Sequence, residues 1–330
     1  MTRGFSVWSM MLLLVLVGHS SFASTWKRIK IPGAKCGNGS PYSVFVRDQD
    51  PSKLVIEFMG GGACWDQTTC LYRAWIYPVP MLKAFGALSD SDNPENPFID
   101  HTNIYFPYCT GDVFAGDYIG NYKLYPVTHM GHTNVRLAIQ YLAQTGIINF
   151  KAVNDLALVG SSAGAIGTLL HAKYIETFVH PNAKKTLIAD SPGLHFGPRF
   201  WSQFSADAKT SFKKAFNDIG LKIDYDDGFV ARRIKPVLNR LSNWKIGFLY
   251  GEKDQIMSEY FGLISKEDHK KLLLSEEGLV ETCKSYPNTK MWLYDSDDHI
   301  FLLFQEKYSL KSMEGSTAIG FVKQVYGESH

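Results

Sequence analysis

After its first twenty residues the sequence has no apolar run long enough to cross a membrane, and it contains no Cys-x-x-Cys pair, internal repeat, low-complexity tract or acidic tail. Charged residues make up 20% of the 330 residues, and the formal net charge is +2. Acidic and basic residues are spread along the chain, so no basic face favours nucleic acid as a partner. The missing Cys-x-x-Cys pair argues against a zinc site. A hydrophobic content of 45% is ordinary for a globular protein with a sizeable core.

The chain begins with a short apolar segment. Residues 10–18 read MMLLLVLVG and are followed by the small residues of Ser21-Phe22-Ala23. About nine apolar residues suit the hydrophobic region of a signal peptide and are too few to span a bilayer comfortably. We expect residues 1–23 to be a cleaved signal peptide, the alternative being an uncleaved anchor. Residues 24–330 are then expected to form one secreted domain.

Secretion changes what the five cysteines mean, because thiols pair in oxidising compartments. Cys64 and Cys70 flank a short polar loop and can bridge. Cys36 and Cys109 are a second possible pair, which leaves Cys283 unpaired and buried. The alternative is that all five are small core residues.

Short apolar runs alternate with longer helical patterns. The runs are continuously apolar or β-branched, as strands buried on both faces are. Residues 134–145 and 163–179 carry apolar side chains at helical spacing. The alternation predicts an α/β fold with a mostly parallel central sheet flanked by helices. The expected strands are residues 53–59, 103–107, 156–160, 186–189, 245–251 and 290–294.

Residues 196–244 interrupt this alternation. The segment is mixed in composition and helical around residues 206–219. It is expected to form a lid-like insertion, or alternatively a helix with its connections packed on the sheet. Its Trp201 and Phe204 either line a site for an acyl group or sugar or pack the lid internally.

The stretch LALVGSSAG, residues 156–164, holds a candidate nucleophile. The pattern Gly-x-Ser-x-Gly places a serine on a tight turn between strand and helix, where side chains on either flank would clash. Only Ser162 has glycines on both sides, at Gly160 and Gly164. A buried strand before it and an amphipathic helix after it fit this pattern, so Ser162 is predicted to be the nucleophile and Ser161 to be structural. The alternative is a plain turn.

A serine hydroxyl needs a base to remove its proton, and in this fold class the chain order is serine, acid, histidine. His299 follows the last expected strand and an acidic loop, so it is the predicted base. Two other histidines follow the candidate acid. His269 lies in a charged helical pattern and is expected to be solvated, and His330 is the final residue.

The acid of such a triad orients the histidine and stabilises its protonated form. Asp254 comes directly after the strand of residues 245–251 and is the predicted acid. Asp190, at the end of residues 186–189, is the rival. The carboxylates at 295, 297 and 298 are too close to His299 in sequence to be favoured.

The oxyanion that forms during acyl transfer needs backbone N–H donors. Gly60, Gly61 and Gly62 follow the strand of residues 53–59, and glycine lets a backbone approach a ligand closely. We expect Gly61 and Gly62 to donate together with Ala163, which opens a helix whose dipole favours negative charge. A phosphate-binding loop is the competing interpretation, but no Walker lysine or Gly-x-Gly-x-x-Gly pattern follows.

Four further residues raise the question of a metal, namely His129, His132, Asp112 and Asp117. Neither the histidine pair nor the aspartate pair has a complete ligand set, so no metal and no cofactor is expected.

Together the motifs GGGACWDQTTC, FPYCTGDVFAG and GSSAG resemble the pectin acetylesterase and Notum family of carboxylesterases, from about Cys36 to about His299. The resemblance implies an α/β-hydrolase fold with a Ser-Asp-His triad in which Ser162 is the nucleophile. It implies an oxyanion hole from the Gly61–Gly62 loop and the Ala163 amide. It also implies Cys36–Cys109 and Cys64–Cys70 disulfides.

The chain departs from the family pattern near the glycine loop. Relatives usually have a glutamate before the glycines, where this chain has Met59, and often an aromatic residue within the loop, where this chain has Gly62-Ala63. Trp65 comes two residues later. Both differences bear on the acyl group.

The sequence therefore predicts a secreted, monomeric serine esterase acting without a cofactor. Acetylated polysaccharide such as pectin is the favoured substrate class, on the resemblance alone. A lipid-modified protein or a lipid ester is the alternative, followed by a non-catalytic binding protein on the same fold and a serine peptidase. Asn38 opens one glycosylation sequon, which matters only in a eukaryotic source.

Overall fold

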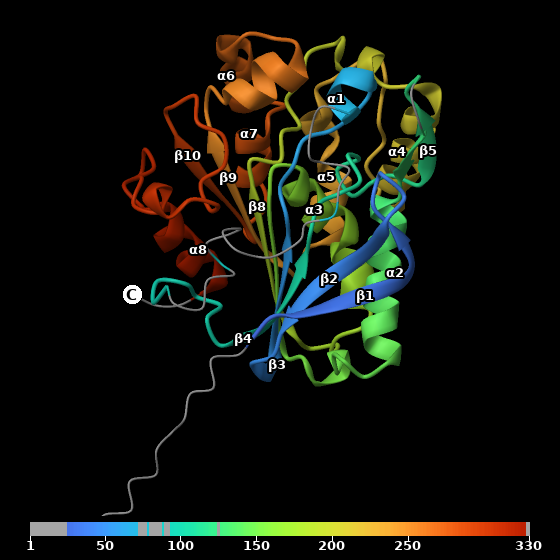
Figure 1. Cartoon of the computed structure of the whole chain (residues 1–330). Helices are drawn as coiled ribbons and strands as arrows, with labels where there is room; N and C mark the ends of the chain where they lie inside the picture. The colour runs from blue at the N-terminus through green and yellow to red at the C-terminus, as the bar shows by residue number, and fades with distance from the viewer. Residues whose placement is uncertain (1–24, 72–77, 79–87, 89–92, 124–125, 328–330) are drawn as a thin grey trace, which may run out of the picture.

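The computed structural model describes residues 25–71, 78, 88, 93–123 and 126–327 (Figure 1). The expected signal peptide and His330 lie outside these residues. An eight-stranded sheet forms the centre of the molecule, in the order β1-β2-β4-β3-β7-β8-β9-β10. A separate hairpin pairs β5 with β6. The strands are β1 Lys27–Lys35, β2 Pro41–Arg47, β3 Asp50–Phe58, β4 His101–Phe106, β5 Tyr118–Asn121, β6 Pro126–His129, β7 Asp155–Ser161, β8 Lys184–Asp190, β9 Lys245–Gly251 and β10 Thr289–Tyr294.

The mostly parallel sheet is confirmed. Strands β4, β3, β7, β8, β9 and β10 pair in parallel, and these six are the expected strands. β1 and β2 extend the sheet by antiparallel pairing and were not expected. β1 contains four basic residues and exposes most of its positions, so it lacks the continuous apolar run of a central strand.

Helices cover both faces of the sheet. Alternate residues of each central strand belong to different clusters: Leu54 and Ile56 pack with α2 and α3 on one face, and Val55 packs with α8 on the other. Figure 1 shows α8 on the opposite side of the sheet from α2 and α3. The helices are α1 Gln67–Leu71, α2 Gly131–Gln144, α3 Ala163–Glu176, α4 Ala206–Asp218, α5 Lys235–Arg240, α6 Lys266–Leu274, α7 Leu279–Lys284 and α8 Ala318–Tyr326. Among the described residues, no helix has the length and apolar character needed to cross a membrane.

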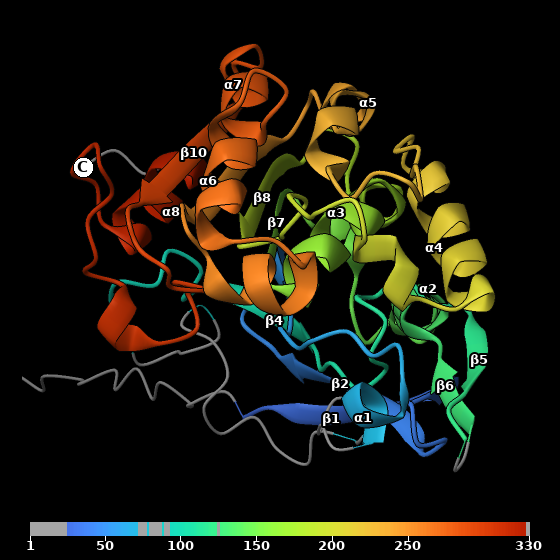
Figure 2. The same cartoon turned by 90° about the horizontal axis from the view of Figure 1, so that it is seen from above.

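The connection between β8 and β9 holds α4 and α5. Seen from above, α3 lies near the centre of the molecule with α4 and α5 to one side and α6 to the other (Figure 2). The side chain of Ser205 caps α4 by accepting a hydrogen bond from the Ala208 N–H. This connection therefore lies beside the helix that starts directly after Ser162.

Candidate active site

Ser162 lies on a sharp turn between β7 and α3. Its backbone has φ 56° and ψ −122°. Residues other than glycine rarely adopt this conformation, which costs about 1–3 kcal/mol. A Cβ atom added at Gly160 would lie 2.2 Å from the carbonyl oxygen of Gly164, and one added at Gly164 would lie 2.1 Å from that of Phe58. The glycines on both sides of Ser162 are therefore a steric requirement of this turn.

His299 and Asp254 meet at the same edge of the sheet, although 45 residues separate them. His299 Nδ1 donates a hydrogen bond to Asp254 Oδ2 over 2.7 Å. The other carboxylate oxygen, Oδ1, accepts from the N–H of Met257 at 2.9 Å. Asp254 is fully buried, and the His299 side chain is 13% exposed. Asp254 is thus held from two sides and fixes the tautomer of the imidazole.

The second nitrogen of His299 is available for proton transfer. Because Nδ1 carries the proton donated to Asp254, Nε2 is the basic nitrogen, and it is buried without a hydrogen-bond partner among the described residues. Ser162 Oγ donates a long, 3.5 Å bond to the carbonyl oxygen of Gly61 instead. No hydrogen bond joins His299 to Ser162 among the described residues, and catalytic hydrogen bonds of this kind often form only when substrate binds.

The glycine loop lies directly against Ser162. Gly61, Gly62 and Ala163 line the same cavity as Ser162, and their N–H groups have no acceptor within the described parts of the chain. A Cβ at Gly61 would lie 2.0 Å from the ring of Tyr108, whose hydroxyl donates to the Gly62 carbonyl at 2.6 Å. Tyr108 therefore holds the glycine loop in place, and the N–H groups of Gly61 and Gly62 are left to bind a ligand.

Both expected cysteine pairs are joined in the structure. Cys36 bonds to Cys109, and Cys64 bonds to Cys70 six residues later. Cys283 is unpaired and buried, and burial raises the pKa of its thiol to about 11. That shift leaves it a poor nucleophile at neutral pH.

The short Cys64–Cys70 loop presents Trp65. Its backbone N–H donates to Thr69 Oγ1 within the loop at 3.0 Å. The indole packs against Phe204 and Phe261, both at 5.7 Å between ring centroids, and against Tyr260 at 6.1 Å. Trp65 therefore joins the disulfide loop to the β8–β9 connection and to the segment after β9.

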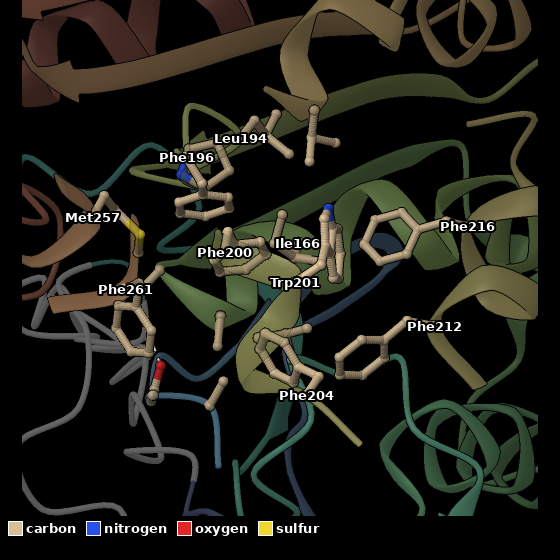
Figure 3. Close-up of a pocket in the computed structure, with 18 residues that line it drawn as sticks. Ile166, Leu194, Phe196, Phe200, Trp201, Phe204, Phe212, Phe216, Met257 and Phe261 are labelled. Atoms are coloured by element: carbon tan, nitrogen blue, oxygen red, sulfur yellow. Dashed lines mark hydrogen bonds between the residues drawn. The ribbon is translucent and has the colours of Figure 1, made fainter. Parts of the chain in front are cut away.

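A cavity of about 70 Å³ adjoins Ser162. Its walls are almost wholly apolar, because the only other lining residue with a polar atom in its side chain is Trp201, whose indole N–H donates to the Asp227 carbonyl. Figure 3 shows aromatic side chains from the β8–β9 connection surrounding the space. Trp201 and Phe204, which the sequence left ambiguous, both line it. The remaining apolar side chains are Ala63, Val113, Ala163, Ile166, Pro192, Leu194, Phe196, Phe200, Phe212, Phe216, Val230, Met257 and Phe261.

Most of these cavity residues were missed in the sequence analysis. One signal for them exists, since six aromatic residues fall between positions 196 and 216. Such density in a segment outside the sheet indicates a surface that packs around something apolar.

Asp190, the rival acid, does not contact the imidazole through a hydrogen bond among the described residues. Its Oδ2 accepts from the N–H groups of Phe301 and Leu302 and from Ser161 Oγ. Burial raises the pKa of its carboxyl group, and the two N–H donors oppose that shift. Asp254, rather than Asp190, therefore occupies the place beside His299.

The four metal candidates are occupied by protein partners. His129 Nδ1 donates to the Thr110 carbonyl, and its Nε2 accepts from Tyr122. Asp112 accepts from Thr110 Oγ1 and the Gly131 N–H. His129 also lies near Cys64 and Cys70, but the disulfide removes both thiolates as ligands.

The other two candidates also have protein partners. Asp117 accepts a hydrogen bond from Thr133 Oγ1, and His132 Nε2 accepts one from Arg136 Nε.

The prediction that His269 is exposed to solvent is wrong. It is fully buried, and its Nδ1 donates to the Glu252 carbonyl at 3.1 Å. Its charged neighbours suggested a solvated face, but His269 and Leu273 lie four residues apart on the one side of α6 that faces the protein.

The chain is similar in sequence to known proteins. A model of the family described as pectinacetylesterase matches residues 23–223. Palmitoleoyl-protein carboxylesterase notum1' of Xenopus laevis is 24% identical over 276 residues, covering 78% of this chain and 54% of that protein. Pectin acetylesterase 11 of Arabidopsis thaliana is 27% identical over 199 residues, covering 56% of this chain and 50% of that protein. The chain spans about half the length of these two relatives.

The solved structure of the Wnt deacylase Notum from Drosophila matches with a TM-score of 0.64 and 17% identity, covering 92% of this chain and 93% of that chain. This likeness confirms the α/β-hydrolase fold. The named relatives are esterases, and the family match spans well over half of the sequence. The chain belongs to the pectinacetylesterase family.

Proposed function

We propose that this protein is a serine carboxylesterase. Ser162 Oγ attacks the carbonyl carbon of an ester while His299 Nε2 takes the hydroxyl proton, and the N–H groups of Gly61, Gly62 and Ala163 stabilise the oxyanion. Collapse of the tetrahedral intermediate breaks the bond to the alcohol oxygen, which receives the proton from His299. The acyl group remains on Ser162.

The second half of the reaction regenerates the enzyme. A water molecule gives a proton to His299 Nε2 and attacks the acyl carbon, and the released Ser162 oxygen takes that proton back. The products are a carboxylic acid and an alcohol, with no cofactor consumed. Asp254 keeps the imidazole in the tautomer that both halves need and stabilises its protonated form.

The acyl group that the geometry supports best is longer than acetyl. The observation that carries this proposal is the apolar cavity beside Ser162. Its 70 Å³ exceed several times the roughly 10–15 Å³ that one water molecule needs, and an acetyl group would leave the aromatic walls unfilled. This reverses the order that the sequence resemblance favoured and agrees with the relatives named as palmitoleoyl-protein carboxylesterases.

A series of p-nitrophenyl esters from acetate to octanoate tests the acyl group. Each buried methylene contributes about 0.8 kcal/mol, so kcat/KM is expected to rise at least tenfold between acetate and octanoate. A maximum at acetate would contradict the long-chain proposal. Ser162→Ala is expected to remove hydrolysis of every ester in the series by a factor of at least about 10⁵. Hydrolysis at the parent rate by that variant would refute the nucleophile assignment and leave a binding protein as the alternative.

Deacetylation of pectin is the second candidate, supported by the family description and the Arabidopsis relative. It predicts that acetate is released from acetylated pectin faster than from p-nitrophenyl acetate at matched ester concentration. Secretion remains part of the proposal, and the two disulfides agree with an oxidising compartment.

A further inference from the structure

The carboxylate of Asp190 connects the ends of two strands with the loop that carries His299. Its Oδ2 accepts from Phe301 N at 2.8 Å, from Leu302 N at 2.9 Å and from Ser161 Oγ at 3.2 Å. Its own carbonyl oxygen accepts from the N–H of Ser162 at 2.7 Å. One buried residue therefore bonds to both the nucleophile turn and the histidine loop.

Ser191 extends this connection. Its Oγ donates to Asp190 Oδ1 at 3.3 Å and accepts from the N–H of Ile300 at 3.1 Å. Both Asp190 and Ser191 are fully buried. Three consecutive N–H groups after His299 thus end on this pair of side chains, so the loop cannot shift without losing buried hydrogen bonds.

The backbone around Asp190 is held in an unfavourable conformation at three positions. Ser162, Ser191 and Ile300 all have positive φ, at 56°, 55° and 57°. For a β-branched residue such as Ile300 this conformation is an outlier that surrounding contacts must impose. Each of the three residues is bonded to Asp190 or Ser191 directly. The hydrogen bonds and the unusual backbone therefore coincide.

We propose that Asp190 is a positioning residue, which sets the distance between Ser162 and His299 by joining the nucleophile turn to the histidine loop. The proposal rests on the proposed esterase function. It also explains the second serine of the motif, because Ser161 supplies one of the donors that hold the Asp190 carboxylate. Asp190 contacts neither the substrate nor the proton that is transferred between Ser162 and His299. It acts by holding His299 in position.

Two substitutions with side chains of similar size distinguish the contribution of the Asp190 hydrogen bonds from the contribution of its volume. Asp190→Leu removes both carboxylate oxygens and leaves the buried N–H groups of Phe301 and Leu302 unpaired, while the backbone carbonyl that accepts from Ser162 stays in place. Asp190→Asn keeps an oxygen where Oδ2 lies, and its amide nitrogen can donate to Ser191 Oγ. A displacement near 1 Å costs about 100-fold in rate. We therefore expect Asp190→Leu to lower kcat about 100-fold with KM within twofold, and Asp190→Asn to keep kcat within about fivefold.

The assay uses the full chain and the p-nitrophenyl ester that the parent hydrolyses best. Asp155→Leu is the matched control, since Asp155 lies at the opposite end of β7 and binds the Tyr326 hydroxyl. It is expected to lower the unfolding temperature without lowering kcat. The proposal is overturned if Asp190→Leu keeps kcat within twofold, if Asp190→Asn loses as much as Asp190→Leu, or if Asp155→Leu loses equal kcat at equal loss of stability.

The double variant Ser161→Ala/Ser191→Ala decides the matter where Asp190→Leu does not fold. It removes two hydroxyl groups from the connection and leaves the carboxylate in place. A fall in kcat of about tenfold at unchanged KM is expected, and an unchanged kcat would overturn the proposal. Failure of the esterase function itself looks different, because the parent chain would then hydrolyse no ester in the series.

Discussion

The edge of the sheet and the cavity beside it are built in opposite ways. At the edge, Ser162, Asp254 and His299 are fixed by short hydrogen bonds and by backbone conformations that few residues adopt. In the cavity, the side chains are large, apolar and packed ring against ring, as Phe200, Trp201 and Phe204 are. In the proposed function the first region makes and breaks bonds, and the second selects the acyl group.

In the proposed function these two properties depend on different kinds of interaction and should be separable by substitution. A hydrogen-bonded constellation loses its function when one atom is removed, whereas an apolar surface changes its affinity by small steps with the area that it buries. Substitutions at the edge should therefore lower kcat for every ester. Substitutions in the cavity should change the ranking of the esters.

The substitution Asp254→Asn tests most strongly whether the catalytic rate can change without a change in acyl-chain preference. An amide beside His299 Nδ1 favours the wrong tautomer, so kcat is expected to fall about 10⁴-fold. The ratio of octanoate to acetate hydrolysis should stay within twofold of the parent. A large change in that ratio, measured on residual activity, would show that the two regions are coupled.

Filling the cavity gives the reciprocal experiment. Ile166 lies on α3 and lines the cavity (Figure 3). Ile166→Phe takes up space that a long acyl chain needs, so kcat/KM for the octanoate ester is expected to fall about 30-fold, since burying several methylenes contributes about 0.8 kcal/mol each. Acetate hydrolysis should remain within twofold, and Ile166→Leu serves as the control of equal volume. Equal losses for both esters would contradict a role in chain-length selection.

Trp65 does not line the cavity but packs against two residues that do, so its truncation is expected to have a smaller effect. Trp65→Ala removes the ring that supports Phe204 and Phe261, and aromatic pairs contribute about 0.5–1.5 kcal/mol each. The octanoate preference should fall about fivefold with acetate kcat unchanged. Trp65→Phe should recover most of it. If Trp65→Ala instead lowers acetate kcat by tenfold, the ring supports the glycine loop rather than the cavity.

The last prediction concerns stability instead of activity and uses a group outside both regions. Burial lowers the pKa of His129 to about 4, against about 6.5 in an unfolded chain. Between these values the unfolded state binds the proton more tightly, so the free energy of unfolding falls as pH decreases from 6.5 to 4, by at most about 1.4 kcal/mol per pH unit. Above pH 6.5 this contribution is constant.

Urea unfolding at pH 7 and pH 5 measures this loss. The decrease in the parent is expected to be larger than in His129→Asn, which keeps a donor for the Thr110 carbonyl but cannot take a proton. His132, whose pKa burial also lowers to about 4, should account for part of the remaining slope. An identical slope in parent and variant would contradict the assignment.

The sequence predicted what depends on local pattern. The strand and turn around Ser162 are encoded locally, because a continuous apolar run and two flanking glycines each leave a clear signal in the sequence. The helix α3 was also expected, but it is buried on almost every side rather than along one apolar stripe. The meeting of Asp254 and His299 could be anticipated because each follows a late strand, and parallel strands end at one edge of the sheet; their catalytic roles stay predictions.

What the sequence did not predict depends on contacts between distant segments. The role of Asp190 follows from the register that brings Ser161 and Phe301 to one carboxylate, and no periodicity encodes that meeting. His269 was misplaced because all four residues within two positions of it in the sequence are charged, while its burial is decided by what α6 packs against. The edge strand β1 was missed for the same reason, since its exposure is set by its place at the end of the sheet.

The unpaired cysteine gives this protein a built-in reporter of its own motions. Cys283 is the one thiol left after four of the five cysteines have paired, and it is buried against Thr289, whose hydroxyl lies at the start of β10. Cys283 is 4% exposed and borders a hollow between α7 and β10. The rate at which a thiol reagent labels it therefore reports how readily α7 moves against β10, at a single natural atom and without any substitution.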